Sequence, residues 1–213
     1  MSSRRWRIAA RIGFPVLLIL AGLAAYFCFP SLRLPADASQ LQSLPGLREV
    51  DAHRFDREWF DAARVGRVDI LGALYDAHYP LDARTHAGYT ALILAAYDEQ
   101  PAALDYLLQA GADPCIGDRN GNTALMGALY KGELPIAQRL LKTRCPIDQM
   151  NNAGETALSF AALFGRLQLL PELVALGADP NHADARGDTP LVIAAKQGNA
   201  EAAAALRKVG ATH

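Results

Sequence analysis

Hydrophobic positions follow two different patterns along this 213-residue chain. The first is an unbroken apolar run over residues 12–29, which contains no charged residue and comes directly after four arginines in residues 1–11. A helix of 18 residues rises about 27 Å, which is close to the roughly 30 Å hydrocarbon core of a bilayer. The run therefore predicts a transmembrane or signal-anchor helix.

The four arginines set the expected orientation of this helix. By the positive-inside rule, residues 1–11 stay in the cytoplasm and everything after residue 29 is exported. In a bacterium this describes a single-pass protein of the inner (cytoplasmic) membrane whose folded part lies in the periplasm. The alternative is a soluble periplasmic protein released by cleavage near Ala38, because Ala36-Asp37-Ala38 has the small-x-small form of a signal-peptidase site.

The second pattern is a repeat of about 33 residues that continues to the C-terminus. Between the two patterns, residues 30–54 contain three prolines and no sustained period, which predicts an extended linker. Four copies of a Gly-x-Thr-[Ala/Pro]-Leu unit follow, one in each period. The glycine of each copy allows a backbone turn with positive φ, and the threonine can cap a short helix through its hydroxyl. The copies begin at the evenly spaced Gly88, Gly121, Gly154 and Gly187.

A second amphipathic helix is predicted after each of these units. Paired apolar residues such as Leu107-Leu108 and Leu140-Leu141 give it one hydrophobic face, and a proline near its start, such as Pro101, costs little. A glycine such as Gly111 or Gly177 then provides a helix C-cap. Because no single unit can bury its apolar face, the pattern predicts an all-α solenoid of about five stacked helix-turn-helix repeats.

The repeat resembles the ankyrin repeat, and Thr189-Pro190-Leu191-Val192-Ile193-Ala194-Ala195 is closest to the signature of that family. The resemblance covers residues 55–213, about three quarters of the chain. Glu58-Trp59-Phe60-Asp61-Ala62-Ala63 with Gly66 aligns one period before the first full unit and lacks its glycine and threonine, as expected of an N-terminal capping repeat. The resemblance implies repeats at about 55–84, 85–117, 118–150, 151–183 and 184–213.

Composition and charge argue against several functions. The net charge is −1, and the charged residues of both signs are interspersed, whereas a nucleic-acid-binding domain usually carries an excess of positive charge. The glycines occur one per unit and lack the lysine of a phosphate-binding loop, and the histidines have no metal-binding spacing. The sequence therefore predicts no enzyme activity, no cofactor or metal, no small-molecule substrate and no nucleic-acid partner.

The cysteines Cys28, Cys115 and Cys145 are too few and too scattered for a disulfide scaffold or a structural zinc site. Neighbouring repeats are expected to lie about 10 Å apart, beyond the roughly 7 Å limit between the Cα atoms of a disulfide. The separation of Cys115 and Cys145 falls three positions short of one period, so the two are out of register. We expect two free thiols here, with a bridge between them as the alternative.

One position of the repeat gives a candidate binding surface. Tyr97, Tyr130, Leu163 and Lys196 follow one another at intervals of one period and should form a row across the stack. The ankyrin resemblance implies that this row, at the end of the first helix, faces the concave groove that binds partners. Aromatic rings with charges beside them are typical of a binding hot spot, although the alternative is that they only cover the ends of the helices. The predicted protein-binding residues are Tyr89, Tyr97, Asp98, Tyr130, Lys131, Leu163, Phe164 and Lys196.

The order of anchor, linker and repeats resembles that of small membrane-anchored ankyrin proteins of the bacterial periplasm, some of which are linked to a catalase and to peroxide resistance. The resemblance implies a scaffold that binds a protein partner through its groove and finger turns, and contacts the membrane through residues 12–29. It further implies a role in oxidative-stress defence. The alternative is an immunity or inhibitor protein that blocks a toxin or an enzyme.

Overall fold

The computed structural model describes residues 52–213, and every regular element in that range is helical. A short 3-10 helix, η2 (Ala52–Phe55), leads into five helix pairs that follow one another along the chain. The pairs are α3 (Asp56–Val65) with α4 (Val68–Asp76), α5 (Ala91–Tyr97) with α6 (Pro101–Ala110), α7 (Ala124–Lys131) with α8 (Leu134–Leu140), α9 (Ala157–Leu163) with η3 (Leu167–Leu169) and α10 (Leu170–Ala175), and α11 (Pro190–Lys196) with α12 (Ala200–Lys208).

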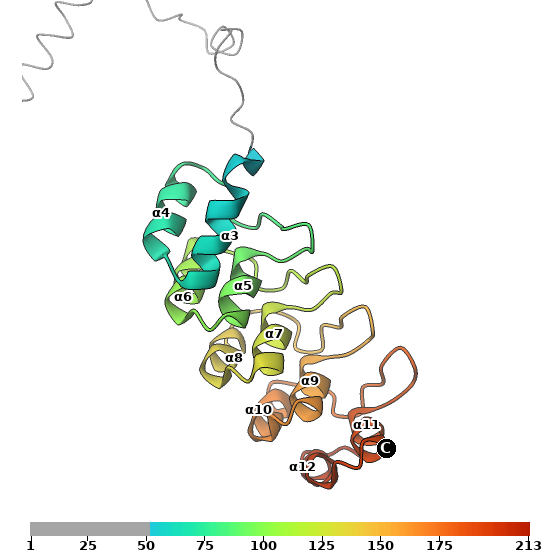
Figure 1. Cartoon of the computed structure of the whole chain (residues 1–213). Helices are drawn as coiled ribbons and strands as arrows, with labels where there is room; N and C mark the ends of the chain where they lie inside the picture. The colour runs from blue at the N-terminus through green and yellow to red at the C-terminus, as the bar shows by residue number, and fades with distance from the viewer. Residues whose placement is uncertain (1–51) are drawn as a thin grey trace, which may run out of the picture. The chain divides into compact units, whose positions relative to one another are not determined.

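The helices form two layers (Figure 1). The first helices of the pairs, α3, α5, α7, α9 and α11, pack against one another in sequence order, and the second helices lie beside them in a second layer. Loops between successive pairs project from the first layer as finger-like turns, around residues 85–89, 118–122, 151–155 and 184–188 (Figure 1). The predicted all-α stack of five helix-turn-helix repeats is therefore confirmed for this part of the chain.

The predicted membrane segment lies outside the described residues. The basic N-terminus at 1–11, the anchor at 12–29 and most of the linker at 30–54 all fall there. Within residues 52–213, no helix has both the length and the apolar composition needed to cross a bilayer.

Each first helix after α3 begins at the threonine of its Gly-x-Thr unit. The threonine hydroxyl accepts a hydrogen bond from the backbone N–H three residues later, for example from Ile93 to Thr90 at 3.2 Å. This bond satisfies one of the free N–H groups at the helix start. The same cap is formed by Thr123, Thr156 and Thr189. The predicted caps are therefore confirmed.

Small buried side chains let the first helices approach closely. Alanines such as Ala95, Ala128 and Ala161 are fully buried in the first helices, and large residues such as Leu104 and Leu173 are fully buried in the second helices. The same core begins at the first repeat, where the buried Trp59 ring packs 5.0 Å from the Tyr79 ring. The hydrophobic core is thus continuous along the stack, as expected of a solenoid.

Successive finger turns are joined by backbone hydrogen bonds. Arg119 N–H donates to the Ala87 carbonyl at 3.0 Å, Asn152 N–H to Asn120 at 2.8 Å, and Ala185 N–H to Ala153 at 2.8 Å. Gly88 makes this approach possible, because a Cβ atom there would lie 2.5 Å from the Arg119 nitrogen. Gly88 also has a φ of 85°, which disfavours other residues.

The loops that follow the second helices form a second series of contacts between repeats. We call these the base loops, residues 78–82, 111–115, 144–148 and 177–181. A side-chain oxygen at one repeat position accepts a backbone N–H from the next repeat in three places. The pairs are Asp82 with Asp113 at 3.1 Å, Asp148 with Asp179 at 3.1 Å, and Asn181 with Thr212 at 2.8 Å.

The fourth link in this series is a disulfide, and the expectation of free thiols at Cys115 and Cys145 was wrong. The Cα atoms of the two cysteines are 5.4 Å apart, well under the helix spacing, because both residues lie in base loops that touch directly. Cys115 occupies the repeat position of Asp82, Asp148 and Asn181. Pro146 stands where the donor N–H would be, and proline has none. The bridge therefore replaces a hydrogen bond that this loop cannot make.

Candidate functional site

Four aromatic rings form a continuous cluster across three repeats. Tyr97 at the end of α5 stacks on Tyr130 of α7, with ring centroids 6.0 Å apart and an interplanar angle of 11°. Tyr130 meets Phe164 edge to face at 4.9 Å, and Phe164 packs 5.4 Å from Phe160 of α9. Tyr97 and Tyr130 remain 37% and 48% exposed, so the cluster presents ring surface to solvent.

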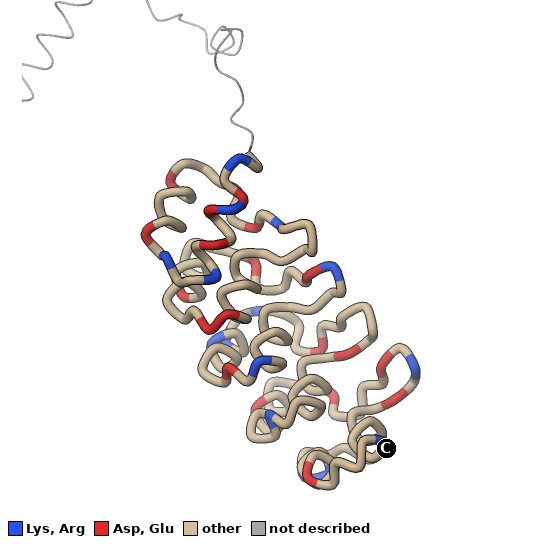
Figure 2. Tube along the Cα trace, in the orientation of Figure 1, with Lys and Arg blue, Asp and Glu red and all other residues tan. Residues whose placement is uncertain are grey.

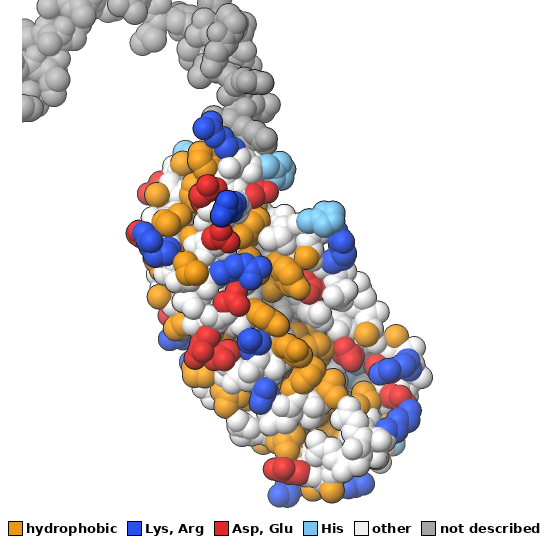
Figure 3. All heavy atoms as spheres, viewed as in Figure 1, with side chains coloured by type: hydrophobic (Ala, Val, Ile, Leu, Met, Phe, Trp, Pro, Cys, Tyr) orange, Lys and Arg blue, Asp and Glu red, His pale blue; other side chains and the backbone are white. Residues whose placement is uncertain are grey.

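These rings line one side of a groove of about 300 Å³. Figure 3 shows the hydrophobic side chains gathered in a hollow between the first helices and the finger turns. We call this the aromatic groove. It is lined by Tyr89, Ile93, Tyr97, Thr123, Met126, Gly127, Tyr130, Phe160 and Phe164, and on the finger side by Asp118, Asn120 and Asn122.

Gly127 explains why the hollow exists at this point of the stack. Its repeat position carries Leu94, Phe160 and Ile193 in the neighbouring repeats, so one large side chain is missing in α7. A Cβ atom added at Gly127 would meet only the Tyr97 ring, at 3.9 Å. The backbone there is helical and would accept other residues. The omission of a side chain, and no special backbone geometry, opens the groove.

The structure brings four of the predicted binding residues into this groove. Tyr89, Tyr97, Tyr130 and Phe164 all line it. Lys131 lies at its edge, where its ammonium nitrogen sits 4.8 Å from the centroid of the Tyr97 ring. A lysine over the face of a tyrosine is attracted by the negative face of the ring. The groove therefore has one aromatic side, and the Lys131 ammonium already lies over the face of its Tyr97 ring.

The other predicted residues lie elsewhere. Leu163 faces a small crevice between α9 and α11, and Phe164, one residue later, takes its place in the aromatic cluster. Lys196 forms an ion pair with Asp188 at 2.7 Å, and Asp98 forms one with Arg64 at 3.2 Å. The row predicted from the repeat spacing thus continues as an aromatic surface only through α5, α7 and the end of α9.

Sequence reasoning missed Gly127, Phe160 and Asp118 as groove residues. Gly127 carried a readable signal, because a glycine replaces a large apolar residue at a repeat position inside a helix. Phe160 is 8% exposed and would be assigned to the core from its apolar pattern. Asp118 lies in the finger turn at 118–122, away from the helix-end positions that the repeat spacing selected. Its place in the groove depends on how far the finger turn folds back over the helices.

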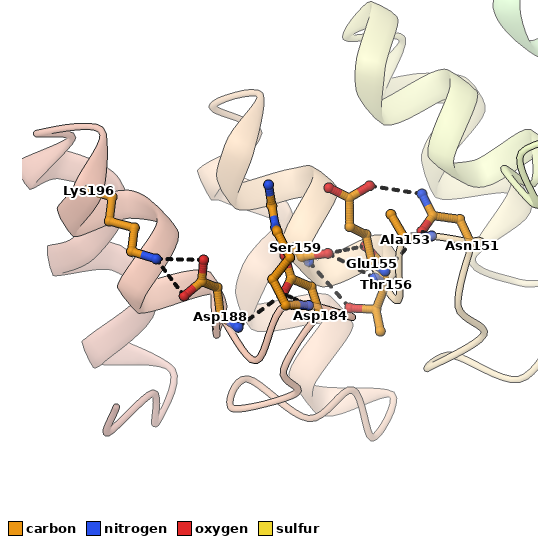
Figure 4. Close-up of polar contacts among 9 residues, drawn as sticks. Asn151, Ala153, Glu155, Thr156, Ser159, Asp184, Asp188 and Lys196 are labelled. Carbon is orange, nitrogen blue, oxygen red and sulfur yellow. Dashed lines mark hydrogen bonds and ion pairs between the residues drawn. The ribbon is translucent and has the colours of Figure 1, made fainter.

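Asp118 holds its own finger turn in place. Its Oδ1 atom accepts the backbone N–H groups of Asn120 at 2.8 Å and Asn122 at 2.9 Å. Asn151 and Asp184 hold the next two turns in the same way. Figure 4 shows these turns, with the reciprocal Thr156 and Ser159 cap between them.

Asp184 also pairs with an arginine of its own turn. Its Oδ2 atom accepts from the Arg186 guanidinium, at 3.1 Å from Nε and 2.9 Å from Nη2. Burial of the carboxylate raises the pKa of Asp184. Hydrogen bonds from Asp188 N–H and from Arg186 together lower the pKa by more than burial raises it, so the net shift is downward. The Asp184 carboxylate is therefore held ionised, and the positive charge of Arg186 in the same turn balances it.

The charged residues of the described part of the chain are spread over the stack (Figure 2). Figure 2 shows acidic and basic residues interspersed along the stack. Among residues 52–213, no group of three or more histidine, cysteine or acidic side chains comes together in an arrangement that could hold a metal ion.

Comparison with known proteins identifies the repeat. A family model described as Ankyrin repeats (3 copies) matches residues 59–151 and 132–213. A stretch of 63 residues, which makes up 30% of this chain, is 36% identical to the mitochondrial disaggregase of Bos taurus. The match spans only 9% of the length of that relative. Together with the five stacked helix pairs, the capped first helices and the projecting turns, the family match shows that the chain belongs to the ankyrin-repeat family.

Proposed function

We propose that the aromatic groove is the surface on which this protein holds a protein partner. Ankyrin repeats form protein-interaction modules that are typically not enzymes. Binding hot spots are rich in tyrosine and cluster where a partner side chain can enter a pocket. The observation that carries the proposal is the omission of a side chain at Gly127, which opens a hollow beneath the exposed Tyr97 and Tyr130.

The proposal includes the location of the groove. Residues 12–29 anchor the chain in the inner membrane, and the repeats lie in the periplasm; cleavage near Ala38 would release the same domain into the periplasm. The Cys115–Cys145 disulfide supports an exported domain, because disulfides persist in oxidising compartments. On the resemblance to small periplasmic ankyrin proteins, the scaffold would support an enzyme such as a catalase in peroxide defence.

The groove is tested by filling it. Gly127→Leu would place a side chain in the hollow, where its first contact is the Tyr97 ring and not backbone. We expect this variant to fold and to lose the partner in a pull-down from detergent-solubilised membranes of the native host. Gly127→Ala is the matched control, since alanine is a better helix former than glycine and fills little of the hollow.

Partner capture by Gly127→Leu at the level of Gly127→Ala would reject the aromatic groove and favour the finger turns. The recovered partner should be assayed with and without the purified ankyrin protein. A stabilised enzyme supports the scaffold, whereas an enzyme or toxin that loses activity would identify an inhibitor.

The location needs a separate measurement. A reporter that is active only in the periplasm, fused after His213, should be active, and the fusion should remain in the membrane after carbonate extraction. Reporter activity in the soluble fraction would favour cleavage near Ala38. An inactive reporter would place the repeats in the cytoplasm and overturn the exported location.

A further inference from the structure

We propose that the aromatic groove takes an arginine side chain of the partner, with the guanidinium on Asp118 and against the tyrosine rings. This inference rests on the proposed function and adds the chemistry of what binds. It starts from a comparison of Asp118 with Asp184, which occupy the same repeat position two periods apart.

The two carboxylates make the same turn but differ in their second oxygen. The Oδ1 atom of each accepts two backbone N–H groups. The Oδ2 atom of Asp184 accepts hydrogen bonds from both Nε and Nη2 of Arg186. At the position of Arg186, the earlier turn has Asn120. There, the Asn122 amide is the one donor within residues 52–213 that reaches Oδ2 of Asp118, at a long 3.4 Å.

Asp118 is therefore a buried carboxylate with room for one more strong donor. It is 8% exposed, and it lies in the wall of the aromatic groove. Among the described residues, none forms an ion pair with it. Burying a carboxylate without a counter-charge is unfavourable, so a cation that enters the groove gains from pairing with it.

The nearby arginines are already engaged. Arg84 donates to the carbonyls of Gly88 at 3.2 Å and Gly117 at 2.5 Å. Arg119 donates to the His86 carbonyl. Both guanidinium groups hold the finger turns together, and neither closes on the Asp118 carboxylate. A partner can therefore supply the counter-charge that these two arginines do not give to Asp118.

The rest of the groove suits a guanidinium. A planar guanidinium stacks on aromatic faces and can give two parallel hydrogen bonds to a carboxylate, which an ammonium group does not do. Lys131 on the Tyr97 face shows that these rings accept a cation. A hollow of about 300 Å³ is at the lower end of the range for ligand pockets, which fits one long side chain of a larger partner.

The test is a selection of random displayed peptides on the full-length chain in detergent, under non-reducing conditions. Selection is repeated on Gly127→Leu to remove peptides that bind outside the groove. We expect groove-dependent peptides to share one arginine. The affinity of one such peptide is then compared with its arginine→citrulline and arginine→lysine forms.

Two variants of the protein isolate the carboxylate. Asp118→Asn should keep the turn, since Asn151 holds the same turn in the next repeat. We expect this variant to lower the affinity for the peptide roughly 10- to 100-fold. Asn120→Arg should supply an internal guanidinium, as Arg186 does for Asp184, and should also weaken binding. Asn120→Gln is its control and should bind as the parent does.

A double-mutant cycle decides the contact. We expect Asp118→Asn and the citrulline peptide each to weaken binding, and their combination to cost little more than either alone. Groove-dependent peptides without arginine, or equal binding to Asp118→Asn, would overturn this inference and leave the groove as a binding site. Failure to select any peptide that depends on Gly127 would overturn both proposals.

Discussion

The second repeat, residues 85–117, and the fourth, residues 151–183, share a four-residue motif near their ends but join their neighbours differently. Both carry Gly-Ala-Asp-Pro, at 111–114 and 177–180. In the next position, Asn181 accepts the Thr212 N–H, whereas Cys115 forms a disulfide with Cys145. The comparison shows that the motif fixes the path of the loop, while the residue after it decides whether the link between repeats is a hydrogen bond or a covalent bond.

The same two repeats differ where the first helix turns into the second. Gly165 in the fourth repeat has a φ of 74°, which glycine adopts at no steric cost. The equivalent residue of the second repeat is Glu99, with a φ of 55°. The fold imposes a left-handed turn at this position even on a residue that disfavours it. The second repeat is thus more tightly linked at its base loop and more strained at its helical turn.

Among the changes that test this comparison of the second and fourth repeats, removing the disulfide should have the largest effect on stability. In the double variant Cys115→Ser and Cys145→Ser, we expect the free energy of unfolding to fall by about 3 kcal/mol, because the bridge closes a 30-residue loop in the unfolded chain. Urea denaturation under non-reducing conditions measures it. The parent protein in reductant should match the variant, and an unchanged midpoint in both would contradict a stabilising bridge.

Removing the hydrogen-bonded link in the fourth repeat should cost less. We expect Asn181→Ala to lower the free energy of unfolding by about 1 kcal/mol, since it leaves the Thr212 N–H without its acceptor. Amide exchange should rise in α12 and the residues after it. Asn181→Asp keeps the acceptor and serves as the control, and faster exchange in that variant too would point to another cause.

Relieving the turn of the second repeat should stabilise the protein. We expect Glu99→Gly to raise the free energy of unfolding by about 0.5–1 kcal/mol, because a side chain in the left-handed region costs energy that glycine avoids. Thermal denaturation beside Glu99→Ala separates backbone strain from charge. If alanine gives the same gain as glycine, the strain explanation fails.

The smallest expected effect concerns Glu133, which follows the next turn of this kind. Desolvation, and then the nearby carboxylate of Glu99, raise the pKa of Glu133. A carboxyl with a raised pKa favours the fold while protonated, and this contribution is lost as the pH rises through that pKa. Two periods later the corresponding pair is Gly165 in the fourth repeat and Asn199 in the fifth, and Asn199 caps α12 instead.

Glu133→Gln should therefore gain stability at pH 7, by only a few tenths of a kcal/mol because the site is partly solvated. The gain should disappear at acidic pH, where both forms are neutral, and should shrink in the Glu99→Gly background. Denaturation at pH 7 and at pH 3 tests the sign. A gain that is equal at both pH values would mean that charge is not its cause.

Much of the fold could be predicted from the sequence because the repeat is local. The Gly-x-Thr unit sets a turn and a cap within a few residues, and its four copies predict the stack without any knowledge of distant contacts. The candidate groove was predictable only in part. The repeat spacing pointed to Tyr97 and Tyr130, but it also selected Leu163, which faces the next helix, instead of its neighbour Phe164.

The sequence by itself determined the helical repeat, its caps, the turn residues and the family, because each depends on groups that lie close together along the chain. Only the tertiary structure decided which residues meet across repeats. Base loops of successive repeats approach closely enough for Cys115 and Cys145 to bond, although the helix spacing argued against it. The finger turn brings Asp118 over the rings that Gly127 leaves uncovered. Contacts of this kind depend on how neighbouring loops fold toward one another, and the repeat period does not encode that.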